Sequence, residues 1–154
     1  HTGASFSPGG SKSRSGIVLK VGNNIISWKS LRQALTAFST TESELEGMTL
    51  GVELAVKLRV MMQEINNTEV SCVLHADNTG AINLATRDQM VWTRMRTRHY
   101  ALRTSWLRDQ LIEEGIPVEH CRTSELAADG LTKVLSKGKL ALARGMLSMI
   151  KWKA

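Results

Sequence analysis

Three short runs at the start of the chain, rich in apolar and β-branched residues in the second and alternating between apolar and polar positions in the third, have the pattern of β-strands. The runs are Thr2–Phe6, Ser15–Val21 and Ile25–Leu31. Gly22-Asn23-Asn24 separates the last two and indicates a hairpin turn. We therefore predict an antiparallel meander of three strands, with Trp28 of the third strand in the core.

The apolar spacing then changes to that of a long helix from Ser39 to Ile65, where Ser39 and Glu42 have the spacing of a capping box. Glu44 falls among apolar positions, within roughly 80° of Met48 and Val52 on a helical wheel. A buried carboxylate is unfavourable unless it is paired, hydrogen-bonded or bound to a metal ion. Glu44 is therefore the first candidate functional residue, whereas four acids lie on the opposite side, where we expect solvent: Glu42, Glu46, Glu53 and Glu64.

The rest of the chain alternates between short apolar runs and helical patterns, which indicates an α/β fold. Strands are expected at Val70–Ala76 and Ile116–Cys121, with the carboxyl end of the first at the usual place for a site. Helices are expected at Asn78–Thr86, at Met95–Glu114, at Ser124–Leu135 with Ser124 as its cap, and at Lys137–Lys153.

Composition and charge narrow the class of protein. The chain has 154 residues, 42% of them hydrophobic and 22% charged, which suits one globular domain with its own core. It has no apolar run of the roughly 20 residues that span a bilayer and no signal peptide, so we expect an intracellular fragment without a membrane partner. The two cysteines, Cys72 and Cys121, are expected to be buried, reduced thiols.

The net charge of +6 lies entirely in the second half, because residues 1–77 hold 7 basic and 7 acidic residues whereas residues 78–154 hold 13 and 7. This asymmetry favours a polyanionic partner such as nucleic acid over a merely soluble basic surface.

Two further acids occupy positions typical of a site. Asp77 directly follows the Val70–Ala76 strand, although it could also cap the next helix, as could Asn78. Asp129 borders an apolar stripe between small residues, although it could simply pair with Lys133 four residues on. For Glu44 the alternative is a capping contact with Thr41.

Three converging carboxylates repel one another unless a cation lies between them. Oxygen ligands without imidazole or thiolate favour Mg²⁺ or Mn²⁺, and two such ions suit phosphodiester hydrolysis.

Several segments, taken in order, resemble the ribonuclease H domain of copia-type retrotransposons over nearly the whole chain. They are Ser15-Gly16-Ile17-Val18, Ile26-Ser27-Trp28-Lys29-Ser30, Leu31-Arg32-Gln33, Ser39-Thr40-Thr41-Glu42-Ser43-Glu44-Leu45, Ala76-Asp77-Asn78-Thr79-Gly80-Ala81-Ile82, Arg96-Thr97-Arg98-His99 and Ala128-Asp129-Gly130-Leu131-Thr132-Lys133. The resemblance implies a mixed five-stranded sheet over residues 1–136 with a helical extension over 137–154. It also implies two bound Mg²⁺ or Mn²⁺ ions, cleavage of the RNA strand of RNA–DNA hybrids, and a reverse transcriptase upstream in the same polyprotein.

The resemblance also implies four catalytic, metal-binding acids, of which Glu44, Asp77 and Asp129 match the second, third and fourth. The first belongs on the first strand, where this chain has Thr2-Gly3-Ala4-Ser5. Gly3 leaves that catalytic position vacant, and the loss of groups that only orient metal ligands already lowers activity about 10–100-fold. We therefore expect the chain to be severely impaired or inactive as an enzyme.

Nucleic-acid contacts are expected from two stretches. By resemblance, the residues before Glu44 face the minor groove of the hybrid, where 2′-hydroxyls distinguish RNA from DNA. A basic ridge on the 95–114 helix is expected to face phosphates, although a solvated basic face remains the alternative. The candidates are Ser39, Thr40, Thr41, Asn78, Thr79, Arg94, Arg96, Arg98 and Arg103.

Two other functions stay open at this point. One is a non-catalytic domain that binds RNA–DNA hybrids or other duplexes. The other is a polynucleotidyl transferase of the integrase type, which the early position of Glu44 and the late position of Asp129 disfavour.

Overall fold

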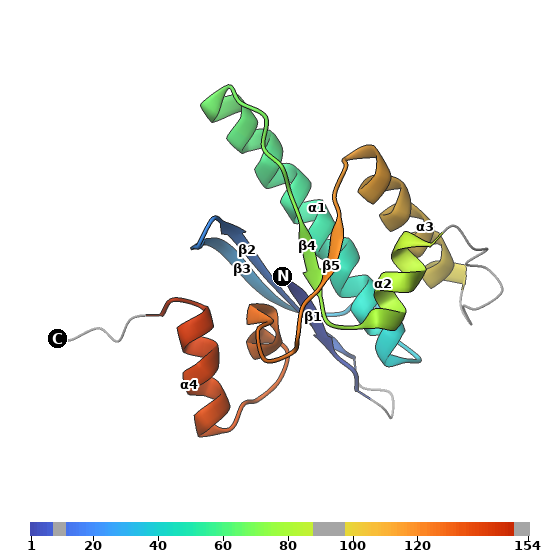
Figure 1. The fold of residues 1–154 in the computed structure, drawn as a ribbon. Helices are drawn as coiled ribbons and strands as arrows, with labels where there is room; N and C mark the ends of the chain where they lie inside the picture. Colours follow the sequence, from blue (N-terminus) through green and yellow to red (C-terminus); the bar gives the residue numbers. More distant parts are fainter. Residues whose placement is uncertain (8–11, 88–97, 150–154) are drawn as a thin grey trace.

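The fold begins with an antiparallel sheet in the order β1-β2-β3, as predicted. Its strands are β1 (Thr2–Ser5), β2 (Arg14–Val21) and β3 (Asn24–Arg32), and Gly22 takes the left-handed conformation in the hairpin turn at a φ of 57°. The structure is a computed structural model that describes residues 1–7, 12–87 and 98–149 (Figure 1).

The long helix α1 (Thr40–Asn66) follows, again as predicted. Ser39 is its N-cap, and the Ser39 hydroxyl accepts a hydrogen bond from the Glu42 amide at 3.1 Å. The Glu42 carboxylate accepts from the Phe38 amide at 2.7 Å, one residue earlier than in a capping box. Asn67 ends the helix in the left-handed conformation.

The second half of the chain forms a parallel pair of short strands with two helices between them. The strands are β4 (Leu74–Ala76) and β5 (Val118–His120), and the helices are α2 (Thr79–Thr86) and α3 (Arg98–Glu113). The α/β class is thus confirmed. The expected helix from Met95 lies partly outside the described residues, which resume at position 98.

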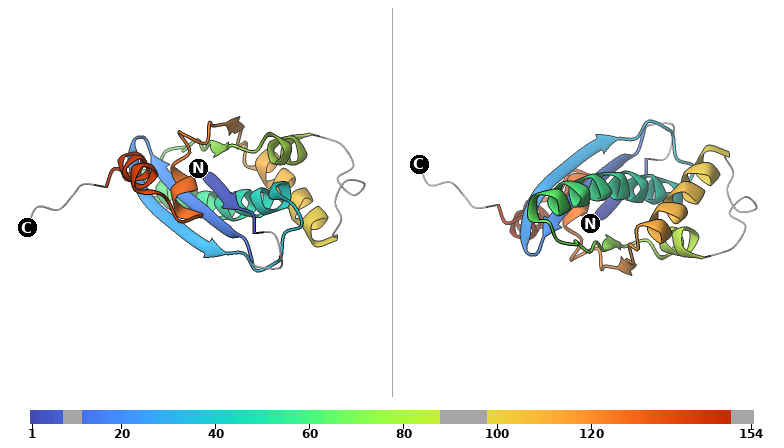
Figure 2. Two further views of the ribbon diagram at one scale, coloured as in Figure 1. Left: turned by 90° about the horizontal axis from the view of Figure 1, so that it is seen from below. Right: turned by 90° about the horizontal axis from the view of Figure 1, so that it is seen from above.

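The two sheets lie side by side across α1, with β1 and β4 as neighbours (Figure 2). The Thr2 hydroxyl donates to the His75 carbonyl oxygen at 3.4 Å, but the described residues form no backbone ladder between the two strands. The β4 ladder begins only at Leu74, because residues 70–73 lie outside the strand. A single five-stranded sheet is therefore not observed.

Opposite faces of the first sheet carry different elements. Thr2 faces α1, where a Cβ added at Gly51 would overlap its methyl group. Gly16 faces the 3₁₀ helix η2 (Ala127–Leu131), where an added Cβ would meet the Ala128 carbonyl oxygen. The prediction of a helix at Ser124–Leu135 capped by Ser124 is wrong in both its length and its cap. The hydrogen bonds of η2 run from the Asp129 amide to the Leu126 carbonyl oxygen and from the Thr132 amide to the Asp129 carbonyl oxygen. This i→i−3 spacing is that of a tight 3₁₀ turn.

Two hydrophobic clusters hold these layers together. The larger one joins α1, β4, α2 and α3, and the smaller one joins β2 to η2. The larger contains Leu45, Met48, Val52, Leu74, Ala76, Ala81, Ala85, Leu107, Leu111 and Ile116, and the smaller contains Val18, Leu126, Ala127 and Ala128.

Some expectations about exposure are wrong. Trp28 is 64% exposed, because β3 is the edge strand of its sheet. Glu42 and Glu46 are only 6% and 3% exposed, because α3 packs against this side of α1 and brings Arg103 to Glu46 at 3.1 Å. Both cysteines carry free thiols as expected, but each is only half-buried.

The last helix, α4 (Lys137–Met146), packs against η2, where Ala143 lies against Gly130. The division into residues 1–136 and 137–154 stays a prediction. Within the described ranges, no helix is both long and apolar enough to cross a membrane.

Gly16→Ala should lower the free energy of unfolding by about 1–3 kcal/mol, because the new methyl group overlaps the backbone of η2. Gly138→Ala is the matched control, since nothing lies near that position and alanine favours a helix by about 0.5–1 kcal/mol over glycine. Urea unfolding followed by circular dichroism measures both. Equal effects of the two substitutions would contradict this packing.

Candidate functional site

Glu44 lies at the free edge of β1. His1 and Val18 exchange two backbone hydrogen bonds of 2.9 Å, so the alternation of an antiparallel ladder turns the Ala4 amide away from β2. The Ala4 amide donates instead to Glu44 Oε1 at 2.9 Å. Glu44 is 7% exposed, and its Oε2 is buried with no hydrogen-bond partner in the part of the chain that is described.

Burial raises the pKa of Glu44 to about 8. The Ala4 hydrogen bond opposes this shift, the charges of Asp77 and Asp129 add to it, and Lys133 opposes it. The charges of the two other candidate acids thus act on Glu44, whereas a shared metal site of the three acids stays a prediction. The expectation that Glu44 lies on a buried face of its helix is confirmed, since Glu44 is 7% exposed and Met48 and Val52 are fully buried.

Asp77 follows β4 directly and is held by the segment after β5. Its Oδ2 accepts a hydrogen bond from the Thr123 hydroxyl at 2.9 Å, and its carbonyl oxygen lies 3.2 Å from His120 Nε2. Asp77 does not cap α2, because Asn78 does so: Asn78 Oδ1 accepts from the Ala81 amide at 2.9 Å.

Asp129 lies within η2 and pairs with Lys133, whose Nζ is 2.7 Å from Asp129 Oδ1. This is the i,i+4 ion pair that the sequence offered as the alternative to a catalytic role. It is partly exposed to solvent and therefore contributes little to stability.

The face of β1 at Gly3 packs against η2, the element that carries Asp129. A Cβ built there would lie 3.2 Å from Leu126 Cδ2 and 3.7 Å from the Asp129 amide nitrogen. The first contact is with the far end of a leucine side chain, which can shift by a few tenths of an ångström. A side chain at position 3 would therefore begin beside the η2 backbone at Asp129, provided that Leu126 shifts.

The side chains of this site are suitable ligands for a divalent cation, but they are not arranged to bind one. Carboxylates are the ligands that Mg²⁺ and Mn²⁺ prefer, and no described residue forms a hydrogen bond with the buried Glu44 Oε2. However, among residues 1–7, 12–87 and 98–149, no group of three or more histidine, cysteine, aspartate or glutamate side chains is arranged to hold a metal ion. Lys133 and Thr123 contact Asp129 and Asp77 instead.

The candidate nucleic-acid residues fall into three groups. Thr41 and Asn78 come together, since both would contact a Cβ added at Gly80, and Thr40 and Thr79 beside them are exposed. Arg98 is exposed at the start of α3, whereas Arg103 is tied to Glu46. Arg94 and Arg96 lie outside the described residues, and Ser39 is engaged as the cap of α1.

Sequence reasoning missed two polar residues that support the site. Gln33 is buried and donates from Nε2 to the Ser15 hydroxyl at 2.9 Å and to the Ser43 carbonyl oxygen at 2.7 Å, which fixes the start of α1 against the sheet. Thr123 holds Asp77. Gln33 belongs to the Leu31-Arg32-Gln33 segment of the resemblance, but that segment does not indicate its hydrogen-bond partners, and Thr123 belongs to no motif.

Known proteins with similar sequences give this geometry a context. The chain is 30% identical to the retrovirus-related Pol polyprotein from transposon TNT 1-94 of Nicotiana tabacum over 138 residues, 90% of the chain. It is 28% identical over 126 residues to the transposon Ty1-JR1 Gag-Pol polyprotein and to the truncated transposon Ty1-A Gag-Pol polyprotein, both of Saccharomyces cerevisiae. The homologues of this chain are retrotransposon polyproteins.

The match covers a small part of each polyprotein. The chain spans 10% of the tobacco protein, 7% of the Ty1-JR1 protein and 10% of the truncated Ty1-A protein. No protein-family model matches the chain. The similarity thus indicates a retroelement-derived segment. The activity of this segment has to be inferred from the residues of the candidate site.

Glu44→Gln should change how stability depends on pH. Because the pKa of Glu44 is raised from 4.5 to about 8 in the folded state, its stabilising contribution is full below about pH 4.5 and is lost as pH rises to about 8. Relative to Glu44→Gln, the unaltered chain should therefore lose free energy of unfolding between pH 5 and pH 9. Urea unfolding of both proteins across this range measures the difference, and a constant difference would mean that Glu44 does not titrate as described.

Proposed function

We propose that this chain is the ribonuclease H-type domain of a retroelement polyprotein. It binds RNA–DNA hybrids, and its cleavage of the RNA strand is severely impaired. The observation that carries the proposal is the Glu44 carboxylate, which is buried at the free edge of β1 with one unpartnered oxygen and within electrostatic reach of Asp77 and Asp129.

A purely structural role for Glu44 accounts poorly for this arrangement. A buried carboxylate that serves stability is normally paired with a cation or fully hydrogen-bonded. Glu46, two residues on, is paired with a cation, because Arg103 lies 3.1 Å from its Oε1, although its Oε2 also has no hydrogen-bond partner among the described residues. Glu44 has a single backbone donor and two nearby negative charges, an environment that suits a group which acts on an external cation or substrate.

The impairment of RNA cleavage in this proposal follows from the glycine at position 3. The proposal assigns Glu44, Asp77 and Asp129 to a Mg²⁺ or Mn²⁺ site, and glycine contributes no ligand to it. The first acid of the chain is Glu42, so no other carboxylate on β1 replaces the missing one. The arrangement of the three remaining acids, two of them contacting Thr123 and Lys133, agrees with a site that is incomplete.

Retained binding without cleavage is the second candidate function, and the same observations favour it. The residues proposed to contact the nucleic acid are separate from the missing carboxylate. Thr40 and Thr79 are exposed near the site, and Arg98 is exposed on α3. A domain with these surfaces and an incomplete metal site would bind hybrids and release them uncut.

Gly3→Asp should restore hybrid cleavage by at least 10-fold in Mg²⁺ or Mn²⁺, because it returns a carboxylate beside the η2 backbone at Asp129. Cleavage of a labelled RNA–DNA hybrid, resolved by gel electrophoresis, measures the rate. Gly3→Asn is the matched control, because it has nearly the same shape without the charge and should restore nothing. Gly3→Asp combined with Glu44→Gln should also remain inactive.

Robust cleavage by the unaltered chain would refute the argument from Gly3. If Gly3→Asp stays inactive and calorimetry detects no Mg²⁺ binding to it, the assignment of the three acids is wrong.

Arg98→Ala should weaken hybrid binding and reduce the slope of log K against log salt by about 0.9, the value for one lost phosphate contact. Fluorescence anisotropy without divalent cations measures this slope. Lys57→Ala is the control, since this exposed lysine lies on α1 about 20 Å beyond Glu44 and should leave the slope unchanged. Equal losses for the two variants would show that Arg98 makes no specific phosphate contact.

A further inference from the structure

One side of the molecule carries basic residues without acids. Residues 12–32, which form β2 and β3, and residues 130–149, which include the end of η2 and all of α4, contain no aspartate or glutamate. η2 packs against β2 and α4 packs against η2, so the two segments form one surface, the basic face (Figure 2). Its nine lysines and arginines are Lys12, Arg14, Lys20, Lys29, Arg32, Lys133, Lys137, Lys139 and Arg144.

The cations of β2 and β3 are free to act on an external partner. Arg14, Lys29 and Arg32 are exposed, and none of the three forms an ion pair with a carboxylate among the described residues. The Arg14 guanidinium is held in place, since its Nη1 donates to Ser30 Oγ at 3.1 Å and to the Ser30 carbonyl oxygen at 3.4 Å. This unneutralised positive charge favours a polyanionic partner.

Trp28 lies in the middle of β3, and its side chain is 64% exposed. In the register of the sheet, Trp28 is opposite Val18 and Arg32 is opposite Arg14. Val18 packs on η2, and residues two or four apart along a strand share a face, so Trp28 and Arg32 both lie on the η2 side of the sheet. Their positions are about 14 Å apart along β3.

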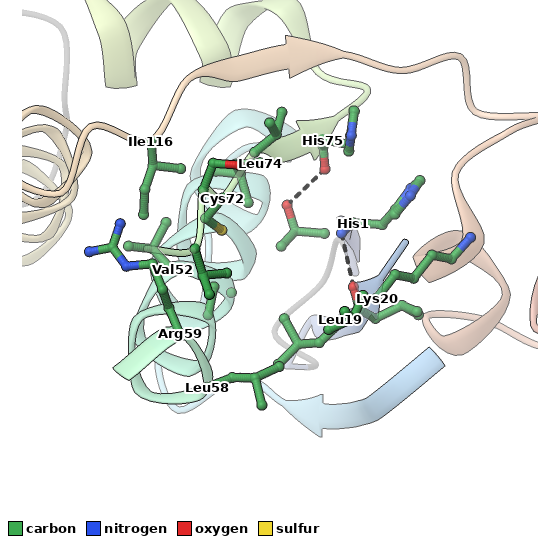
Figure 3. Close-up of a pocket in the computed structure, with 18 of the residues that line it drawn as sticks. His1, Leu19, Lys20, Val52, Leu58, Arg59, Cys72, Leu74, His75 and Ile116 are labelled. Carbon is green, nitrogen blue, oxygen red and sulfur yellow. Dashed lines mark hydrogen bonds between the residues drawn. The ribbon is translucent and has the colours of Figure 1, made fainter. Parts of the chain in front are cut away.

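The cavity beside the other end of β2 is separate from the basic face. Leu19 and Lys20 line this cavity of about 340 Å³ together with Val52 and Leu58 of α1 (Figure 3). Lys20 is the only one of the nine cations that lines it, and Figure 3 shows the Lys20 side chain directed away from Val52 and Leu58. Arg59 on its wall is already paired with Glu114.

An exposed aromatic ring beside unpaired arginines is the combination with which proteins bind single-stranded nucleic acids. The ring stacks on an unpaired base, and the cations contact the phosphates that follow the base along the strand. A duplex matches only the charges, because its bases are stacked on one another and leave no free face for Trp28. A single strand matches both the charges and the ring.

The Arg14 end of the basic face borders the candidate site. Arg14 is opposite Ser5 in the β1–β2 ladder, and Ser5 follows Ala4, whose amide binds Glu44. A strand that runs along β3 from Trp28 toward Arg32 therefore runs toward the end of the sheet at which Glu44 is held.

We propose that β3 and the Arg14 end of β2 form a single-strand track. Trp28 stacks on a base of a single-stranded nucleic acid, and Arg14 and Arg32 contact its phosphates. The track goes beyond the proposed function, because it requires neither Glu44 nor a metal ion and binds a different form of nucleic acid.

Binding of a labelled oligothymidylate to the full chain, measured by fluorescence anisotropy without divalent cations, tests the track. Trp28→Ala should weaken binding about 5–150-fold, the effect of losing one stacked base. Trp28→Phe should keep most of the affinity, but it should remove most of the quenching of tryptophan fluorescence that the oligonucleotide causes in the unaltered chain. Trp106→Ala, at a tryptophan of α3 that is 37% exposed, is the matched control and should change neither quantity.

The phosphate contacts and the separation from the hybrid surface have their own measurements. Arg32→Ala should reduce the slope of log K against log salt by about 0.7, the value for one lost contact on a single strand, whereas Lys57→Ala should not change it. Binding of a blunt-ended RNA–DNA hybrid should be the same for Trp28→Ala and the unaltered chain. The track and the proposed function can therefore fail independently.

Three results would overturn the proposal. One is an equal effect of Trp28→Ala and Trp106→Ala on the affinity, and another is an equal loss of single-strand and blunt-hybrid binding in Trp28→Ala. The third is tight binding to vesicles that contain phosphatidylserine by a chain that does not bind oligothymidylate, which would assign the basic face to a membrane surface. If Trp28→Ala does not fold, the affinity and the quenching of Trp28→Phe decide the question.

Discussion

The hydrogen bond from the Ala4 amide to the Glu44 carboxylate is the interaction on which the site depends. It ties the first turns of α1 to an edge of β1 that has no neighbouring strand at this level. The Ala4 amide lies at a strand edge and has no partner within the sheet, and the buried Glu44 carboxylate requires hydrogen-bond donors. The hydrogen bond between them therefore satisfies the amide and one oxygen of the carboxylate. Gly51 permits this close approach, because a Cβ there would overlap the Thr2 methyl group, whereas a Cβ at Gly47 would only come into contact with the Gly3 carbonyl oxygen.

The sequence predicts the parts of this arrangement that depend on residues close together in the chain. The period of α1, its Ser39 cap and the hairpin at Gly22 are local features, and all three are correct. The helical wheel also places Glu44 on a buried face correctly. It fails for Glu42 and Glu46, because a wheel describes one helix and contains no information about α3, which covers their side of α1 and supplies Arg103.

In the candidate site too, local features are predictable from the sequence and contacts between distant residues are not. Asp77 is predictable because the end of a buried strand fixes its place, whereas the sequence leaves the cap of α2 open between Asp77 and Asn78, and the structure shows that Asn78 is the cap. The contact of Thr123 with Asp77 joins residues 46 apart in the chain, and that of Gln33 with Ser15 joins residues 18 apart. Such contacts depend on tertiary packing, as does the short η2 turn in place of a longer helix, because η2 packs directly on Gly16.

The charge balance at Glu44 explains how this fold exists without a full set of ligands. With a pKa of about 8, Glu44 is mostly protonated at neutral pH, so its burial beside Asp77 and Asp129 does not require a cation. An aspartate at position 3 would add a further negative charge beside the η2 backbone at Asp129, and repulsion of that kind is relieved by a bound cation or by protonation. In the metal site proposed above, glycine at this position would remove both a ligand and a source of repulsion. A protonated Glu44 can then stay buried beside Asp77 and Asp129 without a cation.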